Sequence, residues 1–178
     1  MKVKKYYIYA VIFVIFLATF FHYMNRAGLR QFSDFRVSYS AAERFAHKEY
    51  LYSKFEDKTI ANFKYSPFFA MLFAPLSVFT LSQAGAIFFA INFVFTILIF
   101  VFSKKIIMEG GVSSKETLWL YLLPFLFTFR HVLAVLDAGQ VNIVMVGLVV
   151  MGLYFLKKGN EPVAAALIML SIMFKYTP

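Results

Sequence analysis

The acidic side chains of this sequence, which could move a proton or bind a cation, gather in one stretch. Arg26–Phe79 is the only long polar segment of an otherwise strongly apolar chain, and it holds most of the carboxylates: Asp34, Glu43, Glu49, Glu56 and Asp57. Asp34 is a candidate for proton transfer, and it is also a candidate helix cap at the start of a helical pattern. Glu43 lies more than two helical turns away, so a metal-binding pair with Asp34 is not indicated.

Amide and imidazole groups mark a second place for chemistry, in a short polar break over residues 130–140. Asp137 could touch a substrate or be a solvated turn residue. Gln140 and Asn142 stand near the start of an apolar run, where an unpaired amide is costly, so they bind a ligand or bond to neighbouring helices. A lone histidine at a membrane interface, such as His131, is more often solvated than catalytic.

Two further candidates are a lysine and the loop aromatics. Lys175 follows the last apolar run, where it could grip a phosphate or extend its ammonium group to the membrane surface. Tyr39 and Tyr65 could stack on a sugar ring, although most of the aromatic side chains are expected to pack within the membrane. The sequence has no cysteine, Gly-rich phosphate loop, Walker sequence or zinc-ligand spacing, which excludes thiolate chemistry and cysteine-based metal sites.

Composition places the elements that carry these residues in a membrane. The 178-residue chain is 61% hydrophobic and 15% charged, whereas a soluble domain is usually about half apolar with about a quarter of its residues charged. A net charge of +9 would suggest nucleic acid as the partner of a soluble protein. Here the basic residues flank long apolar runs, so membrane orientation explains them and no nucleic-acid partner is expected.

The apolar runs predict an all-α polytopic membrane protein, with residues 1–178 forming a single membrane domain. Transmembrane helices are expected at 6–24, 84–103, 117–130, 140–156 and 162–176, with an extracytoplasmic loop at 25–80. Within the loop, aromatic residues at helical spacing predict an interfacial helix from about 34 to 47. The run 67–79 is short and contains Pro67 and Pro75, which indicates a second interfacial or re-entrant helix.

Lysine placement sets the expected orientation. Lys2, Lys4 and Lys5 precede the first apolar run and predict a cytoplasmic N-terminus. If 67–79 does not cross, the later lysines are cytoplasmic too, as the positive-inside rule prefers; they are Lys104, Lys105, Lys115, Lys157 and Lys158. The same topology puts the polar break on the side of Asp34. We therefore expect a multi-pass protein of the plasma membrane whose polar groups converge at the extracytoplasmic face.

Taken in order, these segments resemble the front half of the GT-C fold glycosyltransferases. The segments that carry the resemblance are Ser33–Ala42, Tyr50–Tyr52, Phe63–Phe69, Ala74–Leu76, Gly139–Asn142 and Lys175–Pro178. The resemblance extends to glycosyltransferase family 87, the bacterial polyprenyl-phosphomannose-dependent mannosyltransferase-like enzymes. Members of that family are considerably longer, so we expect this chain to be a fragment of a longer fold.

The resemblance implies a function. A hexose, such as mannose, would move from a polyprenyl-phosphate donor to a glycan or lipid acceptor outside the cytoplasm, with Asp34 as general base. Basic side chains would stabilise the phosphate leaving group. The candidate substrate-binding residues are Arg36, Lys64, Tyr65, Arg130, Asp137, Gln140, Asn142 and Lys175. No cofactor is implied, because the lipid-linked sugar is itself the donor, and a divalent metal is not indicated.

Two other functions are compatible with a helical membrane protein. A transporter or flippase component is expected to place charged residues at mid-span, whereas the apolar runs here are almost free of charge. A non-catalytic membrane assembly protein needs no such residues and stays an alternative.

Overall fold

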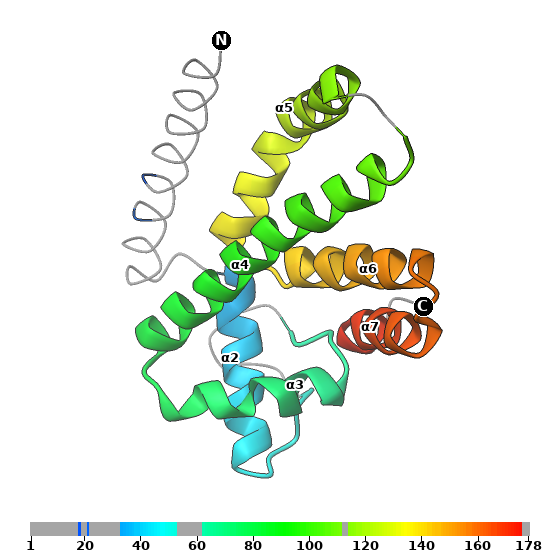
Figure 1. The fold of residues 1–178 in the computed structure, drawn as a ribbon. Coiled ribbons are helices and arrows are strands. Elements are labelled where there is room, and N and C mark those ends of the chain that lie inside the picture. Colours follow the sequence, from blue (N-terminus) through cyan, green and yellow to red (C-terminus); the bar gives the residue numbers. More distant parts are fainter. Residues whose placement is uncertain (1–17, 19–20, 22–32, 53–61, 112–113, 176–178) are drawn as a thin grey trace.

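The computed structural model describes residues 18, 21, 33–52, 62–111 and 114–175 (Figure 1). Within these ranges every regular element is a helix, as the apolar runs predicted. The elements are α2 (Ser33–Ala46), α3 (Pro67–Phe73), the short 3₁₀ helix η1 (Ala74–Val78), α4 (Leu81–Met108), α5 (Ser114–Ala138), α6 (Asn142–Lys157) and α7 (Glu161–Phe174). The first expected span, 6–24, lies outside the described residues except for positions 18 and 21.

Helix α2 forms where the aromatic spacing predicted an interfacial helix, and it lies at the centre of the fold (Figure 1). Phe35 is fully buried, and its ring packs against those of Phe73 and Phe88, with centroids 6.5 and 5.2 Å away. Tyr39 is 8% exposed, and its hydroxyl donates to the carbonyl of Phe79 at 2.7 Å. Of the two roles open to Tyr39, the structure supports packing rather than stacking on a sugar, because the helical spacing directs this ring into the core.

The segment that follows the first loop folds into the short helix that its length and prolines predicted. Ser66 caps α3 by accepting from the amide of Phe69 at 3.2 Å, and Pro67 occupies the first turn, where its missing N–H costs no hydrogen bond. Pro75 cannot continue the α-helical pattern, because it has no N–H to donate, and the chain tightens into η1. Phe69 is fully buried and packs on Phe73, with ring centroids 4.2 Å apart.

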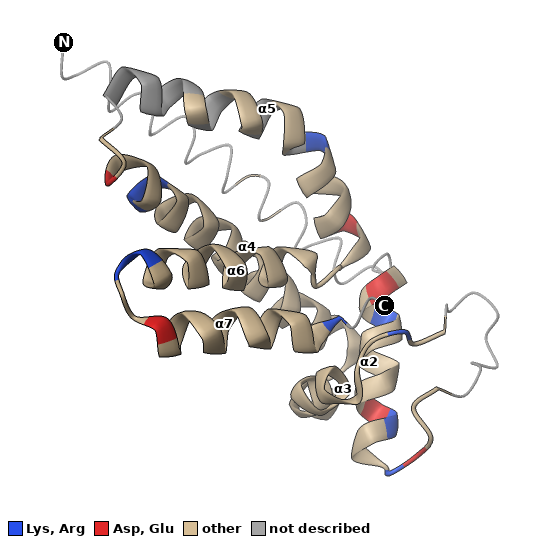
Figure 2. Cartoon of the chain, turned by 90° about the vertical axis from the view of Figure 1, so that its right-hand side faces the viewer, with Lys and Arg blue, Asp and Glu red and all other residues tan. Residues whose placement is uncertain are grey.

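Helix α4 is, among the described residues, the one helix long and apolar enough to cross a membrane. It begins with a capping box, in which Thr80 accepts from the amide of Gln83 and the Gln83 side chain accepts from the amide of Thr80. Its 28 residues continue to Met108, past residue 103 where the expected span ended. Figure 2 shows the charged residues of α4, α6 and α7 near the helix ends. The number of spans and their orientation stay predictions.

Helices α6 and α7 form a hairpin that packs against α4 through α6 (Figure 1). The two helices approach closely at Gly152, where an added Cβ would lie 2.7 Å from the Ile168 side chain and 3.2 Å from the carbonyl of Ala164. Any larger residue at this position would force the Ile168 side chain or the α7 backbone to shift. The hairpin is thus held at a fixed distance, which matters because its open end carries residues of the site described below.

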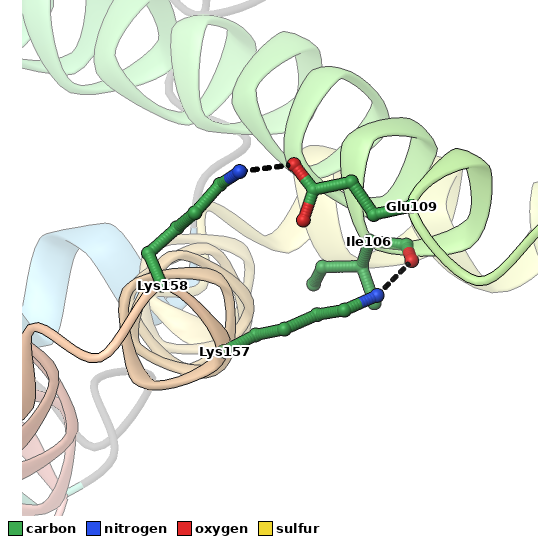
Figure 3. Close-up of polar contacts among 4 residues, drawn as sticks. All are labelled: Ile106, Glu109, Lys157 and Lys158. Carbon is green, nitrogen blue, oxygen red and sulfur yellow. Dashed lines mark hydrogen bonds and ion pairs between the residues drawn. The ribbon is translucent and has the colours of Figure 1, made fainter.

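Lysines join the C-terminal ends of α4 and α6 (Figure 3). Lys158 pairs with Glu109 at 2.7 Å, and Lys157 donates to the carbonyl of Ile106 at 2.8 Å. The hydrogen bond from Lys158 to the Glu109 carboxylate raises the pKa of that lysine. Cations also interact favourably with the C-terminal end of a helix dipole. These contacts gather the basic ends of both helices on one side of the fold.

The polar break predicted over residues 130–140 is wrong for most of its length, because helix α5 occupies it. The helix runs without interruption from Ser114 to Ala138, so Arg130, His131 and Asp137 lie on it rather than in a polar loop. Leucine and alanine, both strong helix formers, surround these polar residues. The backbone turns only at Gly139, whose φ of 66° lies in the left-handed region that glycine tolerates. The interruption is therefore confined to residues 139–141.

Candidate active site

The turn between α5 and α6 is closed by backbone hydrogen bonds. Gly139 donates to the carbonyl of Leu136, and Gln140 donates to the carbonyl of Val135, both at 3.1 Å. This pair of bonds around a left-handed glycine is the Schellman motif, which satisfies the last carbonyls of a helix. Asn142 is then the first residue of α6. Two amide side chains, those of Gln140 and Asn142, are thus presented from a rigid turn.

The Gln140 side chain joins this turn to the first loop. Its Nε2 donates to Oδ2 of Asp34 at 2.7 Å, and its Oε1 accepts from Nδ2 of Asn142, also at 2.7 Å. All three side chains are half-buried. The structure therefore brings Asp34, from the first turn of α2, to the break that lies more than a hundred residues later in the chain. Within the described residues, no second hydrogen bond reaches the Asp34 carboxylate.

Tyr65 lies within the electrostatic reach of Asp34. Burial raises the pKa of the Tyr65 phenol, and the negative charge of Asp34 raises it further. The ring stacks on Phe69 with centroids 4.8 Å apart, and the Tyr65 carbonyl accepts from the hydroxyl of Tyr52 at 3.1 Å. The phenol is therefore held in its neutral form, and its ring is fixed next to the acid.

The C-terminal end of α7 meets the same region. The hydroxyl of Ser66 donates to the carbonyl of Met173, which ties the start of α3 to the last turn of α7. Lys175 follows that turn, and its Nζ lies 5.9 Å from the centroid of the Tyr65 ring. An ammonium group at this distance over an aromatic face is a cation–π contact. One lysine is thus positioned beside an aromatic ring whose phenol is influenced by the charge of Asp34.

An open cavity of about 400 Å³ lies against this group. Its lining is Tyr52, Lys64, Tyr65, Ser66 and Pro67. Asp34 does not line the cavity. Tyr65 does line it, and the charge of Asp34 raises the pKa of the Tyr65 phenol. The arrangement offers a carboxylate, two cations (Lys64 and Lys175) and aromatic rings at one surface, which suits an anionic group joined to a sugar.

The other candidates from the sequence lie at varied distances from this group. Arg36 is half-buried on α2, two residues after Asp34, and Asp137 is half-buried in the last turn of α5. Arg130 is exposed, about 12 Å along the helix axis from the end of α5. Within the described residues Arg130 makes no hydrogen bond or ion pair, so the structure does not join it to Asp34. No group of three or more acidic or histidine side chains in the described ranges could hold a metal ion.

Two residues of the site, Ser66 and Tyr52, were not predicted from the sequence. A serine directly before a proline at the start of an apolar run is a recognisable helix cap, so the capping role of Ser66 could be predicted. Its bond to Met173 spans over a hundred residues and leaves no local signal. Tyr52 was included in the motif of the first loop but was not assigned to the site.

Comparison with known families decides what kind of protein this is. The model of glycosyltransferase family 87 matches residues 63–178, well over half of the chain. The chain belongs to glycosyltransferase family 87. It is therefore a glycosyltransferase of a membrane-associated family, in keeping with the length and hydropathy of α4. Comparison with curated proteins and with solved structures gave no match.

The family 87 match covers most of the candidate site. It includes Tyr65, Gln140, Asn142 and Lys175, and it begins after Asp34. The link between Asp34 and the matched segment is therefore made by the structure, through the hydrogen bond from Gln140.

Proposed function

We propose that this family 87 glycosyltransferase transfers a hexose, such as mannose, from a polyprenyl-phosphate donor to a glycan or lipid acceptor, with Asp34 as general base. The observation that carries the proposal is the 2.7 Å hydrogen bond from Gln140 to Asp34. It connects the acid of the first loop to the segment that matches the family. One carboxylate oxygen is held by this bond, and the other is left to accept a proton.

The proposed step needs one base and one stabilised leaving group. Oδ1 of Asp34 removes the proton of the acceptor hydroxyl while the hydroxyl oxygen attacks the anomeric carbon of the sugar. The bond from that carbon to the donor phosphate oxygen breaks, and the phosphate leaves with the electron pair. Because a phosphate is already a good leaving group, it needs stabilisation of its charge more than it needs a proton.

Lys64 and Lys175 are the cations that best suit the leaving phosphate. Lys64 lines the cavity, and Lys175 lies over the ring of Tyr65. Tyr65 offers an aromatic face for the sugar, since rings commonly pack against apolar faces of a ligand. Arg36 is a weaker candidate, because side chains two residues apart on a helix such as α2 do not face each other. Arg130 is the weakest candidate, being two turns away from the break.

An extracytoplasmic position of the site is supported by the two ends of α6. The end with Asn142 belongs to the site, and the end with Lys157 and Lys158 joins the basic end of α4. Basic residues collect on the cytoplasmic side of membrane proteins. In the proposed multi-pass topology the lysines therefore face the cytoplasm, and Asp34 faces the outside of the plasma membrane.

The test is the substitution Asp34→Asn in the detergent-purified membrane protein. Transfer is measured with synthetic polyprenyl-phosphate mannose, glucose and galactose as donors and radiolabelled sugar as the readout. Loss of a general base is expected to lower the rate by about 10²- to 10⁴-fold. Glu49→Gln is the matched control, since Glu49 is an exposed carboxylate beyond the end of α2. Near-normal transfer by the Asp34→Asn protein, at normal folded yield, refutes the assignment.

A further inference from the structure

The side-chain amide of Gln140 uses both of its polar ends inside the protein. Nε2 donates to Asp34, and Oε1 accepts from Asn142, each at 2.7 Å. A glutamine that recognises a substrate needs at least one of these ends directed at the substrate. Here each end already has a partner at 2.7 Å, which fixes the plane of the amide, while one N–H and one oxygen lone pair remain.

The donor and acceptor groups of the three side chains set the direction of these two hydrogen bonds. An ionised carboxylate only accepts hydrogen bonds, so Asp34 requires the NH₂ end of the Gln140 amide. If that amide were turned over, its oxygen would face a carboxylate oxygen. The carboxylate of Asp34 therefore sets the orientation of the Gln140 amide, and Asn142, whose own amide can present either end, matches it with its NH₂ group.

The backbone supports the same arrangement. Gln140 stands directly after Gly139 in the turn that ends α5, and its own N–H is bonded to the carbonyl of Val135. Asn142 opens α6, a helix packed against both α4 and α7. Functional groups are held most accurately when they come from such rigid elements. Asp34, on α2, is the third fixed point.

We propose that Gln140 is a positioning residue for Asp34, and that Asn142 supports this role by donating to the oxygen of the Gln140 amide. Of the two roles that the sequence left open for these amides, the proposal takes bonds within the protein rather than bonds to a substrate. Gln140 holds Oδ2 of Asp34, so that Oδ1 is aimed at the acceptor hydroxyl. The inference rests on the proposed function for its catalytic meaning, while the chain of hydrogen bonds itself is testable without activity.

The first experiment uses Asn142→Asp to reverse the donor-to-acceptor direction of the two hydrogen bonds. A carboxylate at position 142 accepts from Nε2 of Gln140, which turns the Gln140 oxygen toward the carboxylate of Asp34. We expect a lower melting temperature than that of the parent protein. Adding Asp34→Asn supplies an NH₂ group for the reversed oxygen, so the double variant is expected to regain most of the lost melting temperature. Glu49→Gln in place of Asp34→Asn is the matched control and is expected to restore nothing.

The outcomes separate the proposals. An unchanged melting temperature for Asn142→Asp, or no recovery in the double variant, overturns the chain of hydrogen bonds. If the Asn142→Asp protein fails to accumulate when it is made alone, recovery of folded protein in the double variant supports the two hydrogen bonds. If the double variant also fails to fold while Asn142→Ala folds normally, the two hydrogen bonds are overturned. These results do not depend on whether Asp34 is the base, which the Asp34→Asn transfer assay decides by itself.

The second experiment measures the catalytic consequence with Gln140→Ala and Asn142→Ala. Loss of a hydrogen bond to a charged group that acts in the transition state lowers kcat by about 10- to 100-fold. We expect that loss for Gln140→Ala with KM for donor and acceptor unchanged, and no further loss when Asn142→Ala is added to it. A raised KM with normal kcat would instead mean that Gln140 binds substrate. Wild-type kcat in both single variants would overturn the positioning role, even if Asp34→Asn is inactive.

Discussion

Replacing Ser66 with alanine removes two hydrogen bonds at one junction. The hydroxyl accepts from the amide of Phe69 as the cap of α3, and it donates to the carbonyl of Met173 at the end of α7. A lost N-cap typically costs about 1 kcal/mol, and a lost internal hydrogen bond costs about the same. We therefore expect Ser66→Ala to lower the free energy of unfolding by about 2 kcal/mol.

A second variant separates the two contributions. Glycine is nearly as good a cap as serine, so Ser66→Gly keeps most of the capping and loses only the bond to Met173. It is expected to cost about 1 kcal/mol. The measurement is equilibrium unfolding in mixed micelles with increasing SDS, followed by circular dichroism. Ser82→Ala is the matched control, because Ser82 is exposed in the first turn of α4.

The reasoning fails on either of two results. If Ser66→Ala lies within about 0.5 kcal/mol of the parent protein, as surface substitutions usually do, the junction does not hold α3 to α7. If Ser66→Gly is as stable as the parent, the bond to Met173 contributes nothing. A stable Ser66→Ala protein would also remove the reason for expecting Lys175 to stay over Tyr65.

Two predictions concern the aromatic residues around the site. The phenol of Tyr65 is expected to titrate above its ordinary pKa of 10.0, because burial and the charge of Asp34 both disfavour the anion. Stability should then fall as the pH rises past 10, since the unfolded chain releases this proton first; the alkaline absorbance difference between the parent and Tyr65→Phe measures the titration, and an ordinary value would contradict the assigned burial. Phe69→Ala is expected to cost about 3–5 kcal/mol, because the ring is fully buried. Phe127→Ala, at a ring that is 84% exposed, is its control, and equal losses in the two variants would mean that Phe69 is not a core residue.

The elements of the first loop were predictable because their signals are local. The aromatic spacing that predicted a helix near residues 34–47 corresponds to α2, and the two prolines correspond to the boundaries of α3 and η1. The break at residues 130–140 was predicted too long. Polar side chains were taken as the sign of an interruption, whereas the backbone changes direction only where Gly139 adopts a left-handed conformation.

The sequence predicted that Asp34 and Gln140 share one membrane face, but it did not predict the hydrogen bonds of the candidate site. Lysine placement and apolar runs led to the expectation that Asp34 lies near Gln140, and the structure joins the two. The sequence left two roles open for Gln140 and Asn142, because an amide can bond to a ligand or to a neighbour with equal ease. Only the distances between helices decide that choice. The tie between Ser66 and Met173 likewise depends on how α3 and α7 pack.

The length of α6 has a consequence for the membrane around it. In the proposed topology α6 crosses the bilayer, and its 16 residues reach about 24 Å. A hydrocarbon core is about 30 Å thick, so this helix is too short by roughly a turn. One response to such a mismatch is local thinning of the bilayer. Lipids beside α6 would then sit with their headgroups drawn toward the midplane, and a lipid-linked sugar would reach Asp34 without leaving the leaflet that carries it.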